Sequence, residues 1–132
     1  MSKKIVAVSG YFDPLHSGHI EYLQKAKELG GILVVIVNND RQARLKKGFC
    51  VLPVRERVRI IRELACVDIA IESVDEDQSV CQTLAIIHPH IFANGGDQFN
   101  KEIPEVEVCR TIGIKMIDGL GEKIQSSRWL IK

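Results

Sequence analysis

Apolar runs too short to form helices alternate along the chain with segments in which apolar residues recur at the helical period. The runs are rich in Ile and Val, which is typical of strands buried on both faces of a sheet. We therefore predict five strands, at residues 4–8, 32–37, 67–71, 91–93 and 114–117. Helices are expected at residues 18–30, 54–65, 77–87 and 102–111, with a last one at 126–132.

Breaker residues mark where several of these helices begin and end. The first helix is expected to stop at Gly30-Gly31, because glycine readily adopts the left-handed conformation that closes a helix. Pro53 is expected at the first position of its helix, where its missing N–H costs nothing. Asp77 is a candidate cap for the third helix. The polar and basic segment 38–52 is expected to be a loop.

Strands that alternate with helices pair in parallel through right-handed crossovers. The pattern therefore predicts an α/β protein: a single Rossmann-like three-layer domain with a five-stranded parallel sheet, covering residues 1–132. Ligands of such open sheets bind outside the carboxyl ends of the strands. In this chain the segments 10–19, 38–47 and 94–98 follow those ends, and they hold the unusual polar and glycine residues.

Composition and charge restrict the possible functions. Hydrophobic residues make up 45% of the 132 residues and charged residues 27%, as in an ordinary globular protein. The net charge of +1 lacks the basic excess of a sequence-independent nucleic-acid binder. Because no apolar run approaches the roughly 18 residues that span a bilayer, we expect no membrane partner and a cytoplasmic protein.

The cysteines and two of the four histidines are expected to be structural. The cysteines are widely spaced, form no CxxC pair and therefore carry no zinc or redox signature. They are expected in the protein interior, where cysteine is common, at Cys50, Cys66, Cys81 and Cys109. His88 and His90 flank a proline just before the fourth strand, on the side away from the expected ligand edge.

The segment from Gly10 to His19, Gly-Tyr-Phe-Asp-Pro-Leu-His-Ser-Gly-His, carries the strongest chemical signal. It follows a strand and opens a helix, whose first amide groups and dipole form an anion site. His16 and His19 flank Gly18, which lacks a Cβ and lets a phosphate approach the backbone. Both imidazoles can donate hydrogen bonds to phosphate oxygens, as cations if an anion raises their pKa. The alternatives are capping or surface histidines and, more weakly, a zinc site, for which no recognisable ligand set is present.

With these residues the loop resembles the signature of the HxGH nucleotidyltransferase superfamily and, within it, the cytidylyltransferase-like branch. The chain is similar there to the heptose-phosphate adenylyltransferase domain and to glycerol-3-phosphate cytidylyltransferase. The resemblance covers nearly the whole chain. Further segments match in the family's order, at residues 37–40, 44–48, 53–57, 67–68, 95–97 and 122–127.

The resemblance implies transfer of AMP or CMP from ATP or CTP to a phosphorylated sugar or polyol, with release of pyrophosphate. His16, His19 and Lys46 would be catalytic, and Arg44 and Lys47 would contact the acceptor or the phosphates. Mg²⁺ is expected to accompany the triphosphate without a direct protein ligand. A homodimer is also expected, because members of the family are often dimers. The residues expected to bind the nucleotide are Gly10, Tyr11, Phe12, Asp13, Gly18, Arg57, Gly95, Asp97, Glu122, Ile124, Ser126 and Ser127.

Several of these residues also have a structural interpretation. Asp13 can order the loop or contact a metal, and Arg57 can form a surface salt bridge instead of approaching the nucleotide. The Gly-Gly-Asp at 95–97 also fits an ordinary turn. The pattern does not separate Lys46 from Lys47, since a run of charges is usually a solvated face.

Two positions depart from the family pattern. Leu120 stands where an arginine is common, and Asn94 stands where the heptose branch often has a lysine, although Lys123 can supply one of these charges. Both losses favour a second hypothesis, a catalytically silent nucleotide sensor of the same fold. The donor base and the acceptor stay open. A receiver-like interaction domain fits poorly, because it needs acidic residues after the first strand, and an oxidoreductase would need Gly-x-Gly-x-x-Gly there.

Overall fold

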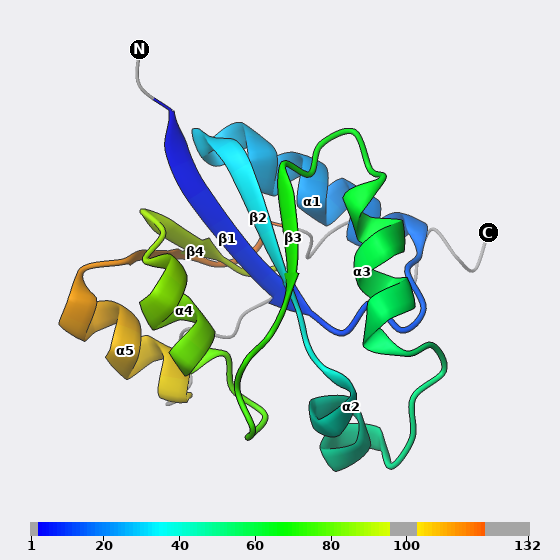
Figure 1. Ribbon diagram of the computed structural model, residues 1–132. Helices are drawn as coiled ribbons and strands as arrows, with labels where there is room; N and C mark the ends of the chain where they lie inside the picture. Colours follow the sequence, from blue (N-terminus) through cyan, green and yellow to red (C-terminus); the bar gives the residue numbers. More distant parts are fainter. Residues whose placement is uncertain (1–2, 96–102, 121–132) are drawn as a thin grey trace.

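Strands and helices alternate along the chain in the computed structural model, which describes residues 3–95 and 103–120 (Figure 1). The strands are β1 (Lys4–Gly10), β2 (Gly31–Val37), β3 (Ile69–Glu72), β4 (Ile91–Ala93) and β5 (Lys115–Ile117). The helices are α1 (Ser17–Gly30), α2 (Asp40–Lys47), α3 (Val54–Arg62), α4 (Cys81–Ile87) and α5 (Pro104–Ile112). The expected helix at 126–132 lies outside the described residues.

The five strands form one parallel sheet in the order β3-β2-β1-β4-β5. Helices α1 and α3 cover one face of this sheet, and α4 and α5 cover the other (Figure 1). Such an arrangement follows from parallel pairing, because the chain must cross back over a face of the sheet before the next parallel strand can begin. The predicted α/β fold, Rossmann-like with three layers and a five-stranded parallel sheet, is confirmed.

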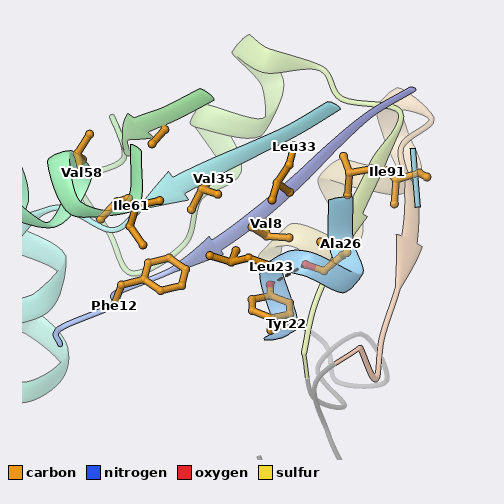
Figure 2. Packing of buried hydrophobic residues seen from close by; sticks show 14 of the residues in the cluster. Val8, Phe12, Tyr22, Leu23, Ala26, Leu33, Val35, Val58, Ile61 and Ile91 are labelled. Atoms are coloured by element: carbon orange, nitrogen blue, oxygen red, sulfur yellow. Dashed lines mark hydrogen bonds between the residues drawn. The ribbon is translucent and has the colours of Figure 1, made fainter. Parts of the chain in front are cut away.

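Alternation of side chains along the strands divides the core into two layers. Val6 and Val8 of β1 share a cluster with α1 and α3, whereas Ala7 belongs to the cluster under α4 and α5. Figure 2 shows the larger cluster, in which Leu23 of α1 and Ile61 of α3 lie on the same side of the sheet as Val8. Full burial of a Leu or Ile side chain contributes about 1.5–3 kcal/mol, so these layers hold the helices on the sheet.

The segment 38–52 contains a helix that the sequence analysis did not expect. Helix α2 begins with a capping box: Asn39 Oδ1 accepts a hydrogen bond from Gln42 N–H, and Gln42 Oε1 accepts one from Asn39 N–H, both at 2.9 Å. Gly48 ends the helix in the left-handed conformation, with φ of 86°. The prediction of a loop was therefore wrong for Asp40–Lys47. The Asn-x-x-Gln spacing followed by a glycine was the signal available in the sequence.

Helix α4 begins later than predicted and is capped by a different carboxylate. Asp77, the expected cap, accepts hydrogen bonds from the amide and hydroxyl of Ser79 (3.0 and 2.7 Å), and the helix starts only at Cys81. The N-cap residue is Val80, whose side chain makes no capping bond, and the buried Asp75 supplies the cap instead by accepting hydrogen bonds from the amides of Gln82 and Thr83 (2.7 and 3.0 Å). Asp75 lies well upstream of the first helical residue, so rules based on neighbouring positions do not find it.

Smaller shifts of element boundaries have local causes. Strand β3 begins at Ile69 rather than at residue 67. At the preceding position, the Asp68 carboxylate, instead of a backbone carbonyl, accepts a hydrogen bond from Leu33 N–H (2.8 Å). Pro53 is the N-cap of α3 rather than its first residue. Pro104, in contrast, is the first residue of α5, a position that does not need an N–H group.

Asp75→Ala is expected to lower the free energy of unfolding by about 2–3 kcal/mol, because it removes a helix cap and leaves buried donors unsatisfied. Asp77→Ala is the matched control, and its exposed carboxylate should cost less than about 1 kcal/mol. Urea denaturation of both variants measures the two losses. Equal losses, or a larger loss for Asp77→Ala, would contradict the assignment of the cap.

Candidate active site

The carboxyl ends of β1, β2 and β4 meet at one edge of the sheet. Between β1 and β4 the connecting helices change from one face to the other, and ligands of open α/β sheets bind at such a point. A cavity of about 270 Å³ lies there. Its walls include Gly10 and Tyr11 from the end of β1, Asn38 from the end of β2, and Lys46 from α2. The cavity therefore coincides with the predicted ligand edge.

His16 and His19 are held at the N-terminus of α1 by their Nδ1 atoms. His16 Nδ1 accepts a hydrogen bond from Gly18 N–H, and His19 Nδ1 accepts one from His16 N–H, both at 3.1 Å. The two imidazoles thus form a reciprocal capping box, and the amide of Gly18 is engaged in it. The rings stack with their centroids 3.7 Å apart. The capping interpretation is correct, and it leaves the Nε2 atoms of both rings for a ligand.

The cap also determines the tautomer of both rings. An Nδ1 atom that accepts a hydrogen bond carries no proton, so each neutral imidazole has its N–H at Nε2. Burial, followed by the charge of His16, lowers the pKa of His19 to about 4, and His19 is therefore neutral near pH 7. In this arrangement the Nε2–H groups of the pair can donate hydrogen bonds to phosphate oxygens.

Gly10 and Phe12 shape the loop that leads into α1. Phe12 is 3% exposed, has a φ of 50°, and places its ring edge-on to His19 at 5.0 Å between centroids. Figure 2 shows this ring inside the larger core cluster. A Cβ atom at Gly10 would lie 2.8 Å from Phe12 Cζ, so a larger residue there would displace the ring. Gly10 thus leaves room for the Phe12 ring, and this ring packs against the His19 imidazole.

Asp13 lies in the loop at residues 10–19, called the signature loop from here on, and joins it to the segment that follows α2. Its buried carboxylate accepts hydrogen bonds from the amides of Val51 and Leu52 (2.8 Å each) and pairs with Lys47 Nζ (2.9 Å). Burial opposes ionisation of Asp13, but these hydrogen bonds and the lysine outweigh it and hold the pKa of the carboxyl below its usual value. The contacts are those of a residue that orders the loop, which is one of the two roles considered from sequence.

The structure separates the basic residues of α2, which the sequence could not. Lys46 lines the cavity, and its Nζ lies 4.8 Å from the centroid of the Tyr11 ring. Lys47 is paired with Asp13, and its Nζ lies 5.4 Å from the ring centroid of Phe49. Arg44 is exposed on the same helix. Lys46 is therefore the lysine that faces the cavity, whereas Lys47 holds the loop.

The guanidinium of Arg57 is buried and bonded to four protein oxygens. Its Nη1 donates to the carbonyls of Tyr11 (2.9 Å) and Asn38 (2.6 Å), and its Nε donates to the carbonyl of Leu52 (2.9 Å). Its Nη2 pairs with Asp40 Oδ1 at 2.8 Å. The salt bridge considered from sequence exists, and it joins a buried guanidinium to a partly exposed carboxylate. Arg57 fixes the backbone around the cavity, and its predicted contact with a nucleotide stays a prediction.

A family model described as cytidylyltransferase-like matches residues 7–120, which are most of the chain. This chain belongs to the cytidylyltransferase-like family. Membership confirms the predicted class of protein, a nucleotidyltransferase, and agrees with a signature loop placed between β1 and α1.

Known relatives support the assignment. The chain is 41% identical over 111 residues to the bifunctional protein HldE of Streptomyces coelicolor, a match that covers 83% of this chain and 24% of that protein. It is 35% identical to HldE of Pelobacter propionicus, with 89% of this chain and 25% of that protein covered. The chain thus spans about a quarter of the length of these relatives.

Solved structures share the fold. A lipopolysaccharide core biosynthesis protein of Thermoplasma volcanium matches with a TM-score of 0.75 and 33% identity, over 89% of this chain and 96% of that one. A protein of unknown function from Archaeoglobus fulgidus matches with a TM-score of 0.63 at 19% identity, which shows the fold alone.

Part of the site predicted for this cytidylyltransferase-like chain lies outside the described residues, namely Asp97, Glu122, Ile124, Ser126 and Ser127. Gly95 is buried just after β4, at the same edge of the sheet as the cavity. Leu120, which replaces a basic residue of the family, is partly buried against the larger core cluster, and its N–H donates to the carbonyl of Asn94 (3.2 Å). This apolar contact accounts for a leucine at position 120.

Sequence reasoning missed several polar residues that line the cavity, among them Gln78, Asn94 and Glu105. Gln78 lies in the connection between β3 and α4, Asn94 follows β4, and Glu105 is in the first turn of α5. Asn94 was noticed only as a departure from the family pattern. Because α5 follows β4, its N-terminus must lie at the carboxyl edge of the sheet, and this topological argument could have indicated Glu105.

His90 and the four cysteines, which were expected to be structural, are not among the residues that line the cavity. His90 is structural: its Nδ1 accepts a hydrogen bond from Ile5 N–H (2.9 Å), at the amino end of β1. Of the cysteines, Cys109 is buried and the other three are partly buried. Within residues 3–95 and 103–120, no group of three or more His, Cys, Asp or Glu could hold a metal ion. Helices long and apolar enough to cross a membrane are also absent from these ranges.

Arg57→Lys is expected to lower the free energy of unfolding by about 2–4 kcal/mol, because an ammonium group cannot reproduce the planar fork that bonds several oxygens. Arg59→Lys, on the exposed side of the same helix, should change it by less than about 0.5 kcal/mol. Chemical denaturation monitored by circular dichroism gives both values. A loss for Arg57→Lys no larger than that for Arg59→Lys would refute the anchoring role.

His19→Gln is expected to make folding less sensitive to acid, because glutamine can preserve the capping box but does not titrate. Folding lowers the pKa of His19 from 6.5 to about 4, so the unfolded chain binds an additional proton between these values. Stability from this group is complete above the unfolded pKa and is lost as the pH falls towards the folded pKa.

Denaturation curves near pH 7.5 and near pH 5 measure this effect. The wild type should lose about 1 kcal/mol more than the variant between them, because solvent screens part of the shift of a half-buried ring. Groups other than His19 titrate in both proteins and cancel in the comparison. An equal loss in the two proteins would show that His19 is not neutral in the folded state.

Proposed function

We propose that this chain transfers AMP or CMP from ATP or CTP to a phosphorylated sugar or polyol and releases pyrophosphate. The observation that carries the proposal is the pair of stacked imidazoles that cap α1 and keep Nε2–H donors for a ligand. Family membership and a cavity beside the same loop support it. A lysine in that cavity, Lys46, adds a positive charge suited to phosphates.

The proposed step is a single displacement at the α-phosphorus of the nucleotide. An oxygen of the acceptor phosphate forms the new P–O bond, and the bond to the bridging oxygen of the β-phosphate breaks. Pyrophosphate leaves with that electron pair. No covalent intermediate on the protein is required, since enzymes of phosphoryl transfer act mainly by positioning the reactants and stabilising charge.

His16 and His19 would donate hydrogen bonds from Nε2 to oxygens of the α- and β-phosphates as negative charge accumulates there. Lys46 would neutralise charge on the acceptor phosphate or on the triphosphate. Asp13, Lys47 and Arg57 would act as positioning residues, because their side chains bond to protein groups that form the loops around the cavity.

Mg²⁺ is proposed to enter with the nucleotide, whose phosphate oxygens are its preferred ligands. Neutralisation of phosphate charge is the chemistry that the ion would supply. Asp13, within the signature loop, is paired with Lys47, and Asp40 is paired with Arg57. This fits an ion held by the substrate rather than by a set of protein carboxylates.

A saccharide acceptor is supported by the relatives. The solved structure from Thermoplasma volcanium is named as a lipopolysaccharide core biosynthesis protein, and the core of lipopolysaccharide is built from sugars. We further expect a homodimer and a cytoplasmic location, as inferred from the sequence.

Pyrophosphate release by the purified protein with Mg²⁺ tests the proposal, with each of ATP, CTP, GTP and UTP crossed with a panel of sugar and polyol phosphates. His16→Asn is the matched variant, because asparagine is a strong helix cap but has no Nε2–H donor. Its turnover should fall at least about 100-fold, the usual cost of losing one donor to a developing charge. Its denaturation midpoint should stay close to that of the wild type.

Each outcome of this panel has a definite meaning. Turnover with one pair of substrates that disappears in His16→Asn establishes the activity and identifies both base and acceptor. Wild-type turnover in His16→Asn would remove the histidine from the proposed mechanism. Nucleotide binding without turnover across the panel would favour the alternative of a catalytically silent sensor.

A further inference from the structure

Part of the cavity lining is amide or carboxylate in character, which the binding of phosphate does not require. This part includes Gln78, Asn94 and Glu105, which come from three different segments of the chain and are here called the polar wall. Glu105 Oε2 accepts a hydrogen bond from Val80 N–H (3.1 Å), and this contact orients the carboxylate. The negative charge of Glu105, after burial, raises the pKa of Tyr11, so this phenol keeps its proton beside the carboxylate.

Asn94 contains a buried donor without a hydrogen-bond partner. Its Nδ2 atom is buried and unpaired, although the residue lines the cavity. An unsatisfied buried amide costs free energy, and native proteins rarely keep one without a reason. The terminal torsion of asparagine is soft, so a small rotation can direct this donor towards a ligand in the cavity.

We propose that Glu105 and Asn94 select the acceptor by binding hydroxyl groups on its carbon chain. The cavity then takes a polyhydroxylated phosphate ester, with its phosphate towards Lys46 and its hydroxyl groups towards the polar wall. This inference rests on the proposed function and identifies the residues that would determine its acceptor.

The chemistry of the wall favours hydroxyl groups over the other common ends of small phosphate esters. A hydroxyl can donate a hydrogen bond to Glu105 and accept one from Asn94, whereas an ammonium group can only donate. An alkyl chain can do neither and would cover the carboxylate without offering it a further hydrogen bond. Sites that hydrogen-bond a substrate hydroxyl discriminate strongly against analogues without it, because their polar groups are then left unpaired.

Binding measured by calorimetry in the absence of nucleotide tests this inference. The probes are glycerol 3-phosphate, mannose 1-phosphate, propyl phosphate and phosphoethanolamine. The variants are Glu105→Gln, which can still accept the hydrogen bond from Val80, and Asn94→Ala, which removes the side-chain amide together with its unpaired donor. Glu107→Gln, on the exposed side of the same helix, is the control.

We expect at least one of the two hydroxylated esters to bind at least about tenfold tighter than propyl phosphate. Both variants should reduce this preference to within about threefold, while the control retains it. Asn94→Ala should also unfold at the same denaturant concentration as the wild type or at a higher one, because its amide donor is unsatisfied in the free protein. A structural role alone would not change the ratio between two ligands.

Several results would overturn the inference: equal binding of propyl phosphate, tightest binding of phosphoethanolamine, a preference unchanged in the variants, or no binding of any ester. Because no nucleotide is present, these results are independent of the pyrophosphate assay. Turnover lost in His16→Asn, together with an unchanged preference in Glu105→Gln, would leave the proposed function intact and reject only the hydroxyl selection.

Discussion

The structure around the cavity depends on one buried cation. The guanidinium of Arg57 binds the carbonyls that follow β1 and β2 and the carbonyl of Leu52, and Asp40 balances its charge. These carbonyls lie in loops, where no neighbouring strand donates hydrogen bonds to them. An apolar residue at position 57 would therefore leave them buried without partners. A single planar donor group thereby holds three loops in the positions that shape the site.

The signature histidines show how the same side chains can serve both folding and chemistry. Their Nδ1 atoms satisfy amide groups at the start of α1, and this use of Nδ1 leaves the proton at Nε2. The stability of the helix and the supply of a phosphate donor therefore depend on the same tautomer. Phe12, held close to Gly10, keeps the second ring in place from the side of the core.

Helix α2 and its N-cap connect the segment between β3 and α4 with the signature loop. Asn39 donates from Nδ2 to the carbonyls of Ser73 and Asp75 (3.0 and 2.9 Å), and Gln42 donates from Nε2 to the carbonyls of Asp77 and Ser79 (2.7 Å each). The same helix carries Lys46 and, through Lys47, holds the signature loop. The polar wall near residue 78 and the basic side of the cavity are thus fixed relative to each other.

The sequence by itself determined the parallel sheet, the edge of the sheet at which the cavity lies and the loop with the two histidines. These features follow from local patterns: apolar runs of strand length, helical periodicity and a short motif at a helix start. Helix α2 could also have been predicted from its capping box, but the many charged residues of this segment led to the prediction of a loop. The roles of Arg57 and Lys47 were decided only by the tertiary structure, because most of their partners are backbone groups or carboxylates distant in sequence, and that of Asp75 because its loop folds back onto the start of α4. Which of two adjacent lysines faces a cavity depends on the helix that carries them and on the loop beside it, and no pattern within the segment itself contains that information.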